Sequence, residues 1–129
     1  FEITETAAIS NLMEVSKFMV GMRQAGCTFA LDDFGSGLSS FAYLKQLDVE
    51  YLKIDGSFVQ HLATDETDKA MVRAITDIGQ TLGKIMVAEF VEDQLSLEYL
   101  TNMGVEYVQG YHLHRPETFE LFLKEPVCD

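Results

Sequence analysis

Basic residues are scarce in this chain of 129 residues, which has 9 Lys and Arg against 21 Asp and Glu and a formal net charge of −12. That imbalance argues against general affinity for nucleic acid or anionic membranes, because neither polyanion gains from contact with an acidic surface. We therefore expect no DNA partner and no membrane contact from this segment. A ligand that carries phosphate would need a metal ion or local Lys and Arg side chains to offset the negative field.

Cysteine is also rare. Cys27 and Cys128 lie far apart without CxxC spacing, so neither a zinc site nor a disulfide framework is indicated. No apolar stretch approaches the roughly 20 residues of a membrane helix, and no signal-peptide pattern is present. We expect a soluble segment in the reducing cytoplasm, even if its parent chain is anchored in a membrane elsewhere.

Linkers, internal repeats and low-complexity segments are absent, and only two residues are proline. With 47% hydrophobic residues, the chain has enough apolar material for a real core. We therefore expect residues 1–129 to form a single globular unit. The sequence begins inside an apolar run without a cap or turn before it, so we interpret that unit as part of a larger domain.

Short apolar runs recur along the chain and predict buried strands. They cover residues 1–4, 27–31, 51–54, 85–88 and 107–108. Segments of helical period separate them, and strands that alternate with helices indicate parallel βαβ units. The expected fold class is α/β.

Three of the intervening segments carry apolar residues at i, i+3 and i+4 spacing, which is typical of helices packed by one face. The first spans residues 9–23, and Gly26 is its expected C-terminal stop. The second spans residues 71–82 and follows Asp65 and Thr67, two candidate caps. The third spans residues 93–103. Its inward-facing side chains are expected to be Leu95, Tyr99, Leu100 and Met103.

Polar side chains fall within, follow or end each apolar run. They are Glu2, Glu5, Asp32, Asp33, Lys53, Asp55, Glu89, Glu92 and Gln109. In a TIM-type (β/α)8 barrel the C-terminal ends of the strands converge on one rim, so these groups would meet in space. A closed barrel of this type has eight strands and about 250 residues, whereas this chain shows five runs. It therefore looks like the latter half of such a barrel.

Two adjacent acids, Asp32 and Asp33, are the most informative feature. They follow an apolar run and lead into the Gly-Ser-Gly of the stretch TFALDDFGSG. Unpaired buried charge is costly, so the simplest interpretation is that a divalent metal ion neutralises the two carboxylates. Hard oxygen ligands select Mg²⁺ or Mn²⁺, and two such ions about 4 Å apart can support phosphodiester hydrolysis.

Taken singly, these residues have structural interpretations. Lys53 could reach solvent at a strand end, and Glu2 or Glu89 alone would more often be an exposed acid than a ligand. The DDFG stretch could be a capped turn, or an imitation of the kinase metal motif without the loops that accompany it. Asp55 is interpreted as a cap for the turn at Gly56. Only the joint pattern favours a metal site.

Five stretches, FEITET, LDDFGSGLSS, LKIDGSFV, VAEFVE and QGYHLHRP, resemble in order and spacing the second half of the EAL-type cyclic-di-GMP phosphodiesterase domain of bacteria. Five ordered motifs make chance agreement improbable. The resemblance implies the C-terminal portion, about five βα units, of a modified TIM-type (β/α)8 barrel. It also implies hydrolysis of cyclic-di-GMP to linear pGpG with two Mg²⁺ or Mn²⁺ ions.

The resemblance assigns roles at the metal centre. It implies that Glu2, Asp32, Asp33 and Glu89 bind metal, with Asp32 as the ligand that both ions share. Lys53 would contact the attacking water and the scissile phosphate. Glu89 would act as the general base or through the metal. Lys53, Glu89 and Asp32 are thus the expected catalytic residues.

Supporting roles follow from the same resemblance. Glu5 would anchor the loop after the double aspartate, and Glu92 and Gln109 would orient waters and ligands. The segment 34–40 would couple dimerisation or substrate to the metal site. Phe90 stands where the commonest form of the fourth motif has glycine. Its ring could redirect the loop that carries Glu92 or point into the helix layer.

The signature Glu-Ala-Leu and an asparagine ligand of the family would lie in the missing first half, so the metal site of this chain lacks at least two ligands. We expect the chain alone to be inactive and the intact domain to be an enzyme. Two alternatives stay open, a cyclic-di-GMP-binding module without turnover and a fragment that completes the barrel with another chain. The resemblance also allows a homodimer and further signalling domains in the parent chain.

Overall fold

The computed structural model of the chain describes residues 1–37 and 41–123. At its centre lies a parallel sheet whose strands pair in the order β1-β2-β3-β4-β5. The strands are β1 (Glu2–Thr4), β2 (Ala30–Phe34), β3 (Tyr51–Ile54), β4 (Ile85–Ala88) and β5 (Tyr107–Val108). Parallel pairing of each strand with the next one along the chain confirms the predicted α/β fold of successive βα units.

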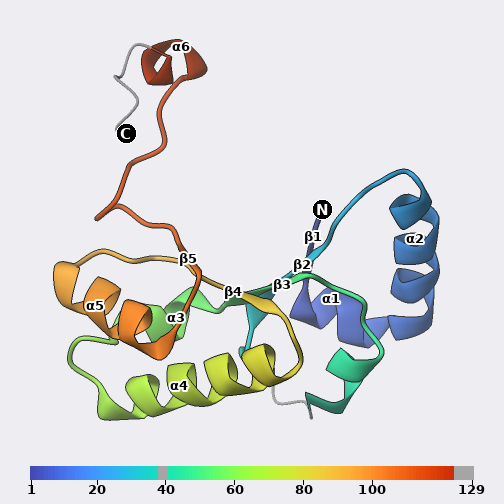
Figure 1. The fold of residues 1–129 in the computed structure, drawn as a ribbon, viewed down its shortest axis with the longest axis horizontal. Helices are drawn as coiled ribbons and strands as arrows, with labels where there is room; N and C mark the ends of the chain where they lie inside the picture. Colours follow the sequence, from blue (N-terminus) through green and yellow to red (C-terminus); the bar gives the residue numbers. More distant parts are fainter. Residues whose placement is uncertain (38–40, 124–129) are drawn as a thin grey trace.

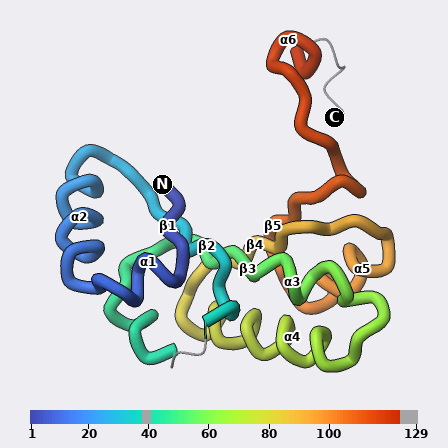
Figure 2. The backbone as a smooth tube through the Cα atoms, turned by 180° about the vertical axis from the view of Figure 1, so that it is seen from behind, coloured from blue at the N-terminus to red at the C-terminus, as the bar shows by residue number. Residues whose placement is uncertain are grey.

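Most of the helices lie on one side of this sheet, and the helix Leu12–Gln24 stands beside its first strand (Figures 1 and 2). The arm that follows β5 leaves on the other side and carries a short helix, Phe119–Phe122. The helical elements are α1 (Glu5–Ser10), α2 (Leu12–Gln24), the 3₁₀ helix η1 (Phe41–Lys45), α3 (Gly56–Val59), α4 (Glu66–Thr81), α5 (Gln94–Met103) and α6 (Phe119–Phe122). Helices on one side are what the wall of a (β/α) barrel has, whose other face lines the interior, so the arrangement fits the predicted partial barrel.

Strand residues alternate between these two faces. Leu31, Leu52 and Met86 are fully buried and belong to the hydrophobic core with Val72 and Ile75 of α4. The residues between them point to the opposite face. Among these, Ala30, Tyr51, Lys53 and Val87 line a common hollow. The sheet therefore presents its chemistry-bearing side chains on the face away from the helices.

Strand β2 extends further than the sequence predicted. The expected run was 27–31, whereas β2 covers Ala30–Phe34 and so contains both aspartates. Its register against β3 shifts, because Leu31 pairs with Leu52 while Phe34 pairs with Ile54. This is a β-bulge, with one extra residue on β2. The apolar pattern stops at the aspartates, and the pattern alone could not show that backbone pairing continues through them.

The first helical segment is split. A single helix over 9–23 was predicted, but α1 begins at Glu5 directly after β1, and the chain breaks at Asn11 before α2. The backbone of Asn11, with φ −147° and ψ 59°, is not helical. The predicted stop is confirmed, because Gly26 follows α2 with φ 84°, a left-handed conformation that glycine adopts without strain.

The other two predicted helices are confirmed as α4 and α5. Asp65 caps α4 by accepting hydrogen bonds from the backbone N–H groups of Thr67 and Asp68. The predicted inward side of α5 is partly wrong, because Leu100 is buried but Leu95 is 45% exposed. The two residues lie about 140° apart around the helix axis, so they cannot share one narrow buried face.

A search of the described residues for a helix that is long and apolar enough to span a membrane found none.

Candidate metal centre

Lys53 lies at the centre of the candidate site, on β3, and is 6% exposed. Its Nζ atom lies 2.9 Å from Oε1 of Glu2, 3.3 Å from Oδ1 of Asp32 and 2.8 Å from Oε1 of Glu89. These acids come from β1, β2 and the end of β4, so parallel pairing brings them to one place. Burial lowers the pKa of Lys53, but its hydrogen bonds to Glu89 and Glu2 outweigh that effect and raise the pKa overall. Lys53 is therefore charged at neutral pH.

Three carboxylates gather beside this lysine. Asp32, Asp33 and Glu89 each place an oxygen so that all three atoms lie within 4.8 Å of one another. Neighbouring residues of a regular strand point to opposite faces, which would separate Asp32 from Asp33. The bulge in β2, with Asp33 at a left-handed φ of 54°, lets both side chains reach the same place. The irregular backbone thus assembles the cluster.

The cluster holds more negative charge than one lysine offsets. Burial is the main cause that raises the pKa of Glu89. The hydrogen bond and charge of Lys53 lower this pKa, whereas the charges of Asp32 and Glu2 raise it, and the net shift is upward. Burial also raises the pKa of Asp33, and the neighbouring charges of Asp32 and Asp55 add to it. Glu89 is buried and Asp33 is exposed, so both shifts share crowding by neighbouring negative charge, which a bound cation would relieve.

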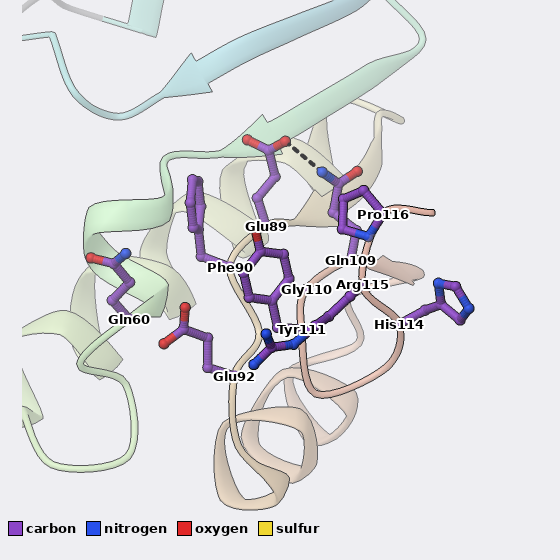
Figure 3. A pocket seen from close by; sticks show the side chains of 10 residues that line it. All are labelled: Gln60, Glu89, Phe90, Glu92, Gln109, Gly110, Tyr111, His114, Arg115 and Pro116. Carbon is purple, nitrogen blue, oxygen red and sulfur yellow. Dashed lines mark hydrogen bonds between the residues drawn. The ribbon is translucent and has the colours of Figure 1, made fainter. Parts of the chain in front are cut away.

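Gln109 fixes the orientation of Glu89. Its side-chain Nε2, just after β5, donates a hydrogen bond of 2.9 Å to Oε1 of Glu89 (Figure 3). Lys53 contacts the same oxygen. In the described part of the chain no hydrogen bond reaches the other oxygen, Oε2, which leaves it free to accept a proton or a ligand.

Glu5 is a fully buried carboxylate that anchors the backbone after the aspartates. Its Oε2 accepts hydrogen bonds from the N–H of Gly35 at 3.1 Å and of Gly37 at 3.0 Å. Its Oε1 accepts one from the hydroxyl of Tyr43 on η1. Burial raises the pKa of the Tyr43 hydroxyl, and the hydrogen bond to Glu5 raises it further, so the hydroxyl keeps its proton and donates.

Sequence reasoning missed Tyr43, since nothing in the run 41–45 sets it apart. Of the expected coupling segment 34–40, residues 38–40 lie outside the described part of the chain. Asp55 is confirmed as a cap, because its side chain accepts a hydrogen bond of 2.8 Å from the N–H of Ser57 at the start of α3.

The remaining predicted residues take different places. Glu2 contacts Lys53 but does not belong to the group of three acids that could hold a metal in the described residues. Glu92 is exposed and lines a pocket beside Glu89. Phe90 does not enter the helix layer. Its ring is 51% exposed, covers Gly56 at the start of α3, and lines the same pocket (Figure 3).

The donor set fits a hard divalent cation. Carboxylate oxygens are the ligands that Mg²⁺, Mn²⁺ and Ca²⁺ prefer, and three of them converge here from two strand ends. Asp32, Asp33 and Glu89 are thus the residues that could hold metal, with Lys53 as a further positive charge among them. The fold and site together define an α/β protein of the barrel type, with a cluster of carboxylates at the C-terminal ends of its strands that could hold a metal ion.

The chain belongs to the EAL domain family, whose family model matches residues 1–116. The cyclic di-GMP phosphodiesterase PdeB of Shewanella oneidensis is 44% identical over 125 residues, which make up 97% of this chain but 15% of PdeB. The family resemblance inferred from the five motifs is confirmed.

Solved structures share the fold. The PaMucR phosphodiesterase of Pseudomonas aeruginosa, in complex with c-di-GMP, superposes with a TM-score of 0.88 and 39% identity over 94% of this chain and 49% of that chain. The manganese/cyclic-di-GMP complex of BlrP1 from Klebsiella pneumoniae gives a TM-score of 0.79 and 31% identity over 86% of this chain and 28% of that chain. The chain thus spans about half of the first solved chain and less of the second, and 18% of the full-length MucR protein.

Proposed function

We propose that this chain is part of a metal-dependent phosphodiesterase that opens cyclic-di-GMP to linear pGpG. The observation that carries the proposal is the cluster of acids around Lys53, whose Nζ contacts three carboxylates within 3.3 Å. A module that only binds a ligand has no need for so many costly clustered charges. The names of the relatives and the ligands in their solved structures supply the substrate.

The proposed metals are two Mg²⁺ or Mn²⁺ ions. Asp32, Asp33 and Glu89 would hold them, with Asp32 shared and Glu2 as a further ligand. When bound, such ions activate water and stabilise the charge on the departing oxygen.

The chain's own side chains have separate tasks in this proposal. Lys53 places a fixed positive charge where the phosphate gains negative charge. Glu89, oriented by Gln109 and Lys53, holds the proton that the attacking water gives up. Glu92 borders the same pocket and would orient water or ligand there.

We also propose that the first strands of the barrel come from residues that precede this chain in its parent. The five-stranded sheet ends at β1 and β5 in the described residues. We also propose a cytoplasmic location, a homodimer and further signalling domains in the parent chain. The scarcity of cysteine supports the cytoplasmic location. The small share of PdeB that the chain covers supports the further domains.

The test is hydrolysis of cyclic-di-GMP with Mn²⁺, followed by chromatography of pGpG. The 129-residue chain is compared with the same chain joined to the preceding residues of its parent. We expect little or no pGpG from the short chain and sustained production by the long one. Robust turnover by the short chain would refute the proposed division of the site. Binding without any pGpG from the long chain would favour the silent binding module.

A further inference from the structure

Phe90 holds an unusual backbone conformation for a residue with a side chain. Its φ is 57°, in the left-handed region that glycine enters freely and aromatic residues rarely adopt. It directly follows Glu89, so this conformation decides where its ring stands relative to the metal centre. Such strained conformations persist only where the surroundings hold them in place.

The Phe90 ring packs against Gly56, which leaves space for it. A Cβ atom placed on Gly56 would lie 2.0 Å from Cδ2 of Phe90, 2.6 Å from Cε2 and 2.9 Å from Cγ. Gly56 is not among the glycines with positive φ, so its backbone does not require glycine. The absent side chain instead leaves room for the aromatic ring. Gly56 and Phe90 therefore form a matched pair across the ends of β3 and β4.

The ring is held on one side and open on the other. It stays 51% exposed although it is packed on Gly56. Its open side borders a pocket of about 460 Å³, which Glu89, Gln109 and Tyr111 also line. In Figure 3 the Phe90 ring stands beside the Glu89 side chain, on the same side as its carboxylate. An aromatic face thus lies next to the group proposed to act on the phosphate.

The same pocket also carries a cation and a second aromatic ring. The guanidinium carbon of Arg115 lies 5.1 Å from the ring centroid of Tyr111, and both residues line the pocket. A flat ligand that is linked to a phosphate matches this combination. Its ring can stack on an aromatic face, and its anionic part can lie near the cation and the metal centre.

We propose that the exposed face of Phe90 stacks on a purine base of the bound nucleotide, and that Gly56 holds the ring in position for this contact. This inference rests on the proposed function and deepens it, because it assigns a base-binding residue to this chain. Phe90 is then a specificity residue of the site, and its strained backbone conformation serves to present the ring.

The test is a titration of the 129-residue chain, labelled with ¹³C in its phenylalanine rings, with cyclic-di-GMP in the presence of Ca²⁺. We expect a saturable shift of the Phe90 ring signals. Phe90→Leu keeps an apolar side chain but removes the π face, and we expect it to weaken cyclic-di-GMP binding about 10-fold. Ribose 5-phosphate, which has no base, should bind the variant and the unaltered chain equally.

Two further variants isolate the contact. Gly56→Ala should weaken cyclic-di-GMP binding as Phe90→Leu does, and it should add nothing when both changes are combined. Phe18→Leu is the matched control, because Phe18 is 47% exposed on α2 and does not line the pocket. It should leave binding unchanged.

Three results would overturn the inference. They are unmoved Phe90 signals during saturation by cyclic-di-GMP, equal affinity of Phe90→Leu and the unaltered chain, and absence of saturable binding up to millimolar ligand. Failure of the proposed function is a separate result, the absence of pGpG from the longer chain with Mn²⁺. The shift of the Phe90 signals is read in the unaltered chain, so it decides the question even where a variant fails to fold.

Discussion

At the scale of single residues, Lys53 is the charge on which the site depends. Its side chain is 8% exposed and faces three acids. A buried charge that loses its partner is strongly destabilising, by about 3–5 kcal/mol. Here the loss of one lysine would leave three carboxylates facing one another.

We therefore predict that Lys53→Met lowers the melting temperature of the chain without metal, and that Mn²⁺ restores more stability to the variant than to the unaltered chain. Thermal melts with and without Mn²⁺ measure this difference. Lys17→Met is the control, because Lys17 is exposed and its ion pair with Glu14, at 3.8 Å, is also exposed. Equal melting of Lys53→Met and the unaltered chain would contradict the assigned ion contacts.

The Tyr43 hydroxyl is a second residue whose removal has a definite expected effect. Tyr43→Phe takes one hydrogen-bond donor from the fully buried Glu5 carboxylate. A buried acceptor left unsatisfied costs about 1–3 kcal/mol. We expect urea denaturation to show a loss of that size. Tyr107→Phe, at a tyrosine that is 57% exposed, should change the free energy of unfolding by far less. Equal effects of the two changes would refute the role of Tyr43.

At the scale of elements, Asp93 controls the start of α5. Its carboxylate accepts hydrogen bonds from the backbone N–H and the hydroxyl of Ser96, at 2.7 Å and 2.8 Å. The backbone hydrogen bond is the main cause that lowers the pKa of Asp93 below its ordinary value of 3.8. A lowered pKa in the folded state means that the stabilisation is present above pH 3.8 and is lost as the pH falls through the lower folded value.

Asp93→Ala should therefore cost about 1 kcal/mol at pH 7, the usual value of an N-cap. The difference from the unaltered chain should shrink as the pH falls below the folded pKa of Asp93. Chemical denaturation at several pH values measures it. Asp77→Ala, at an exposed acid on α4, should show no such pH-dependent difference. A constant difference down to low pH would show that the ionised cap is not the cause.

The elements also show what the sequence could reveal. The strands at 51–54, 85–88 and 107–108 could be predicted, because short, largely apolar runs between helical segments are typical of the strands of parallel sheets. The bulge in β2 could not, since it depends on pairing between Leu31, Phe34 and their partners on β3. The break at Asn11 was missed for a similar reason, because apolar spacing continues across it.

Some residues of the site could be predicted from the sequence, and others could not. Side chains at strand ends could be predicted to converge, and Lys53, Asp32 and Glu89 do so. The contact between Phe90 and Gly56 could not, because it joins two segments through a ring and an absent side chain. The spacing of residues along the chain does not indicate such a contact.

At the scale of the whole molecule, the sheet is a wall with helices on one side (Figure 1). The side chains of the metal centre lie on the other face, where a closed barrel would have its interior. This arrangement explains why an acidic chain can be proposed to bind an anionic dinucleotide. In the proposed function, bound cations and Lys53 would decide binding at the rim, rather than the net charge of −12.

The central claim is that the carboxylates around Lys53 hold the metals that drive hydrolysis. The most direct measurement is the rate of pGpG formation by the longer chain with Asp32→Asn, at saturating Mn²⁺. The amide keeps the size of the side chain but removes its charge, so we predict loss of metal-dependent turnover with an unchanged circular-dichroism spectrum. Asp77→Asn should keep the full rate. An unchanged rate for Asp32→Asn would contradict the metal assignment.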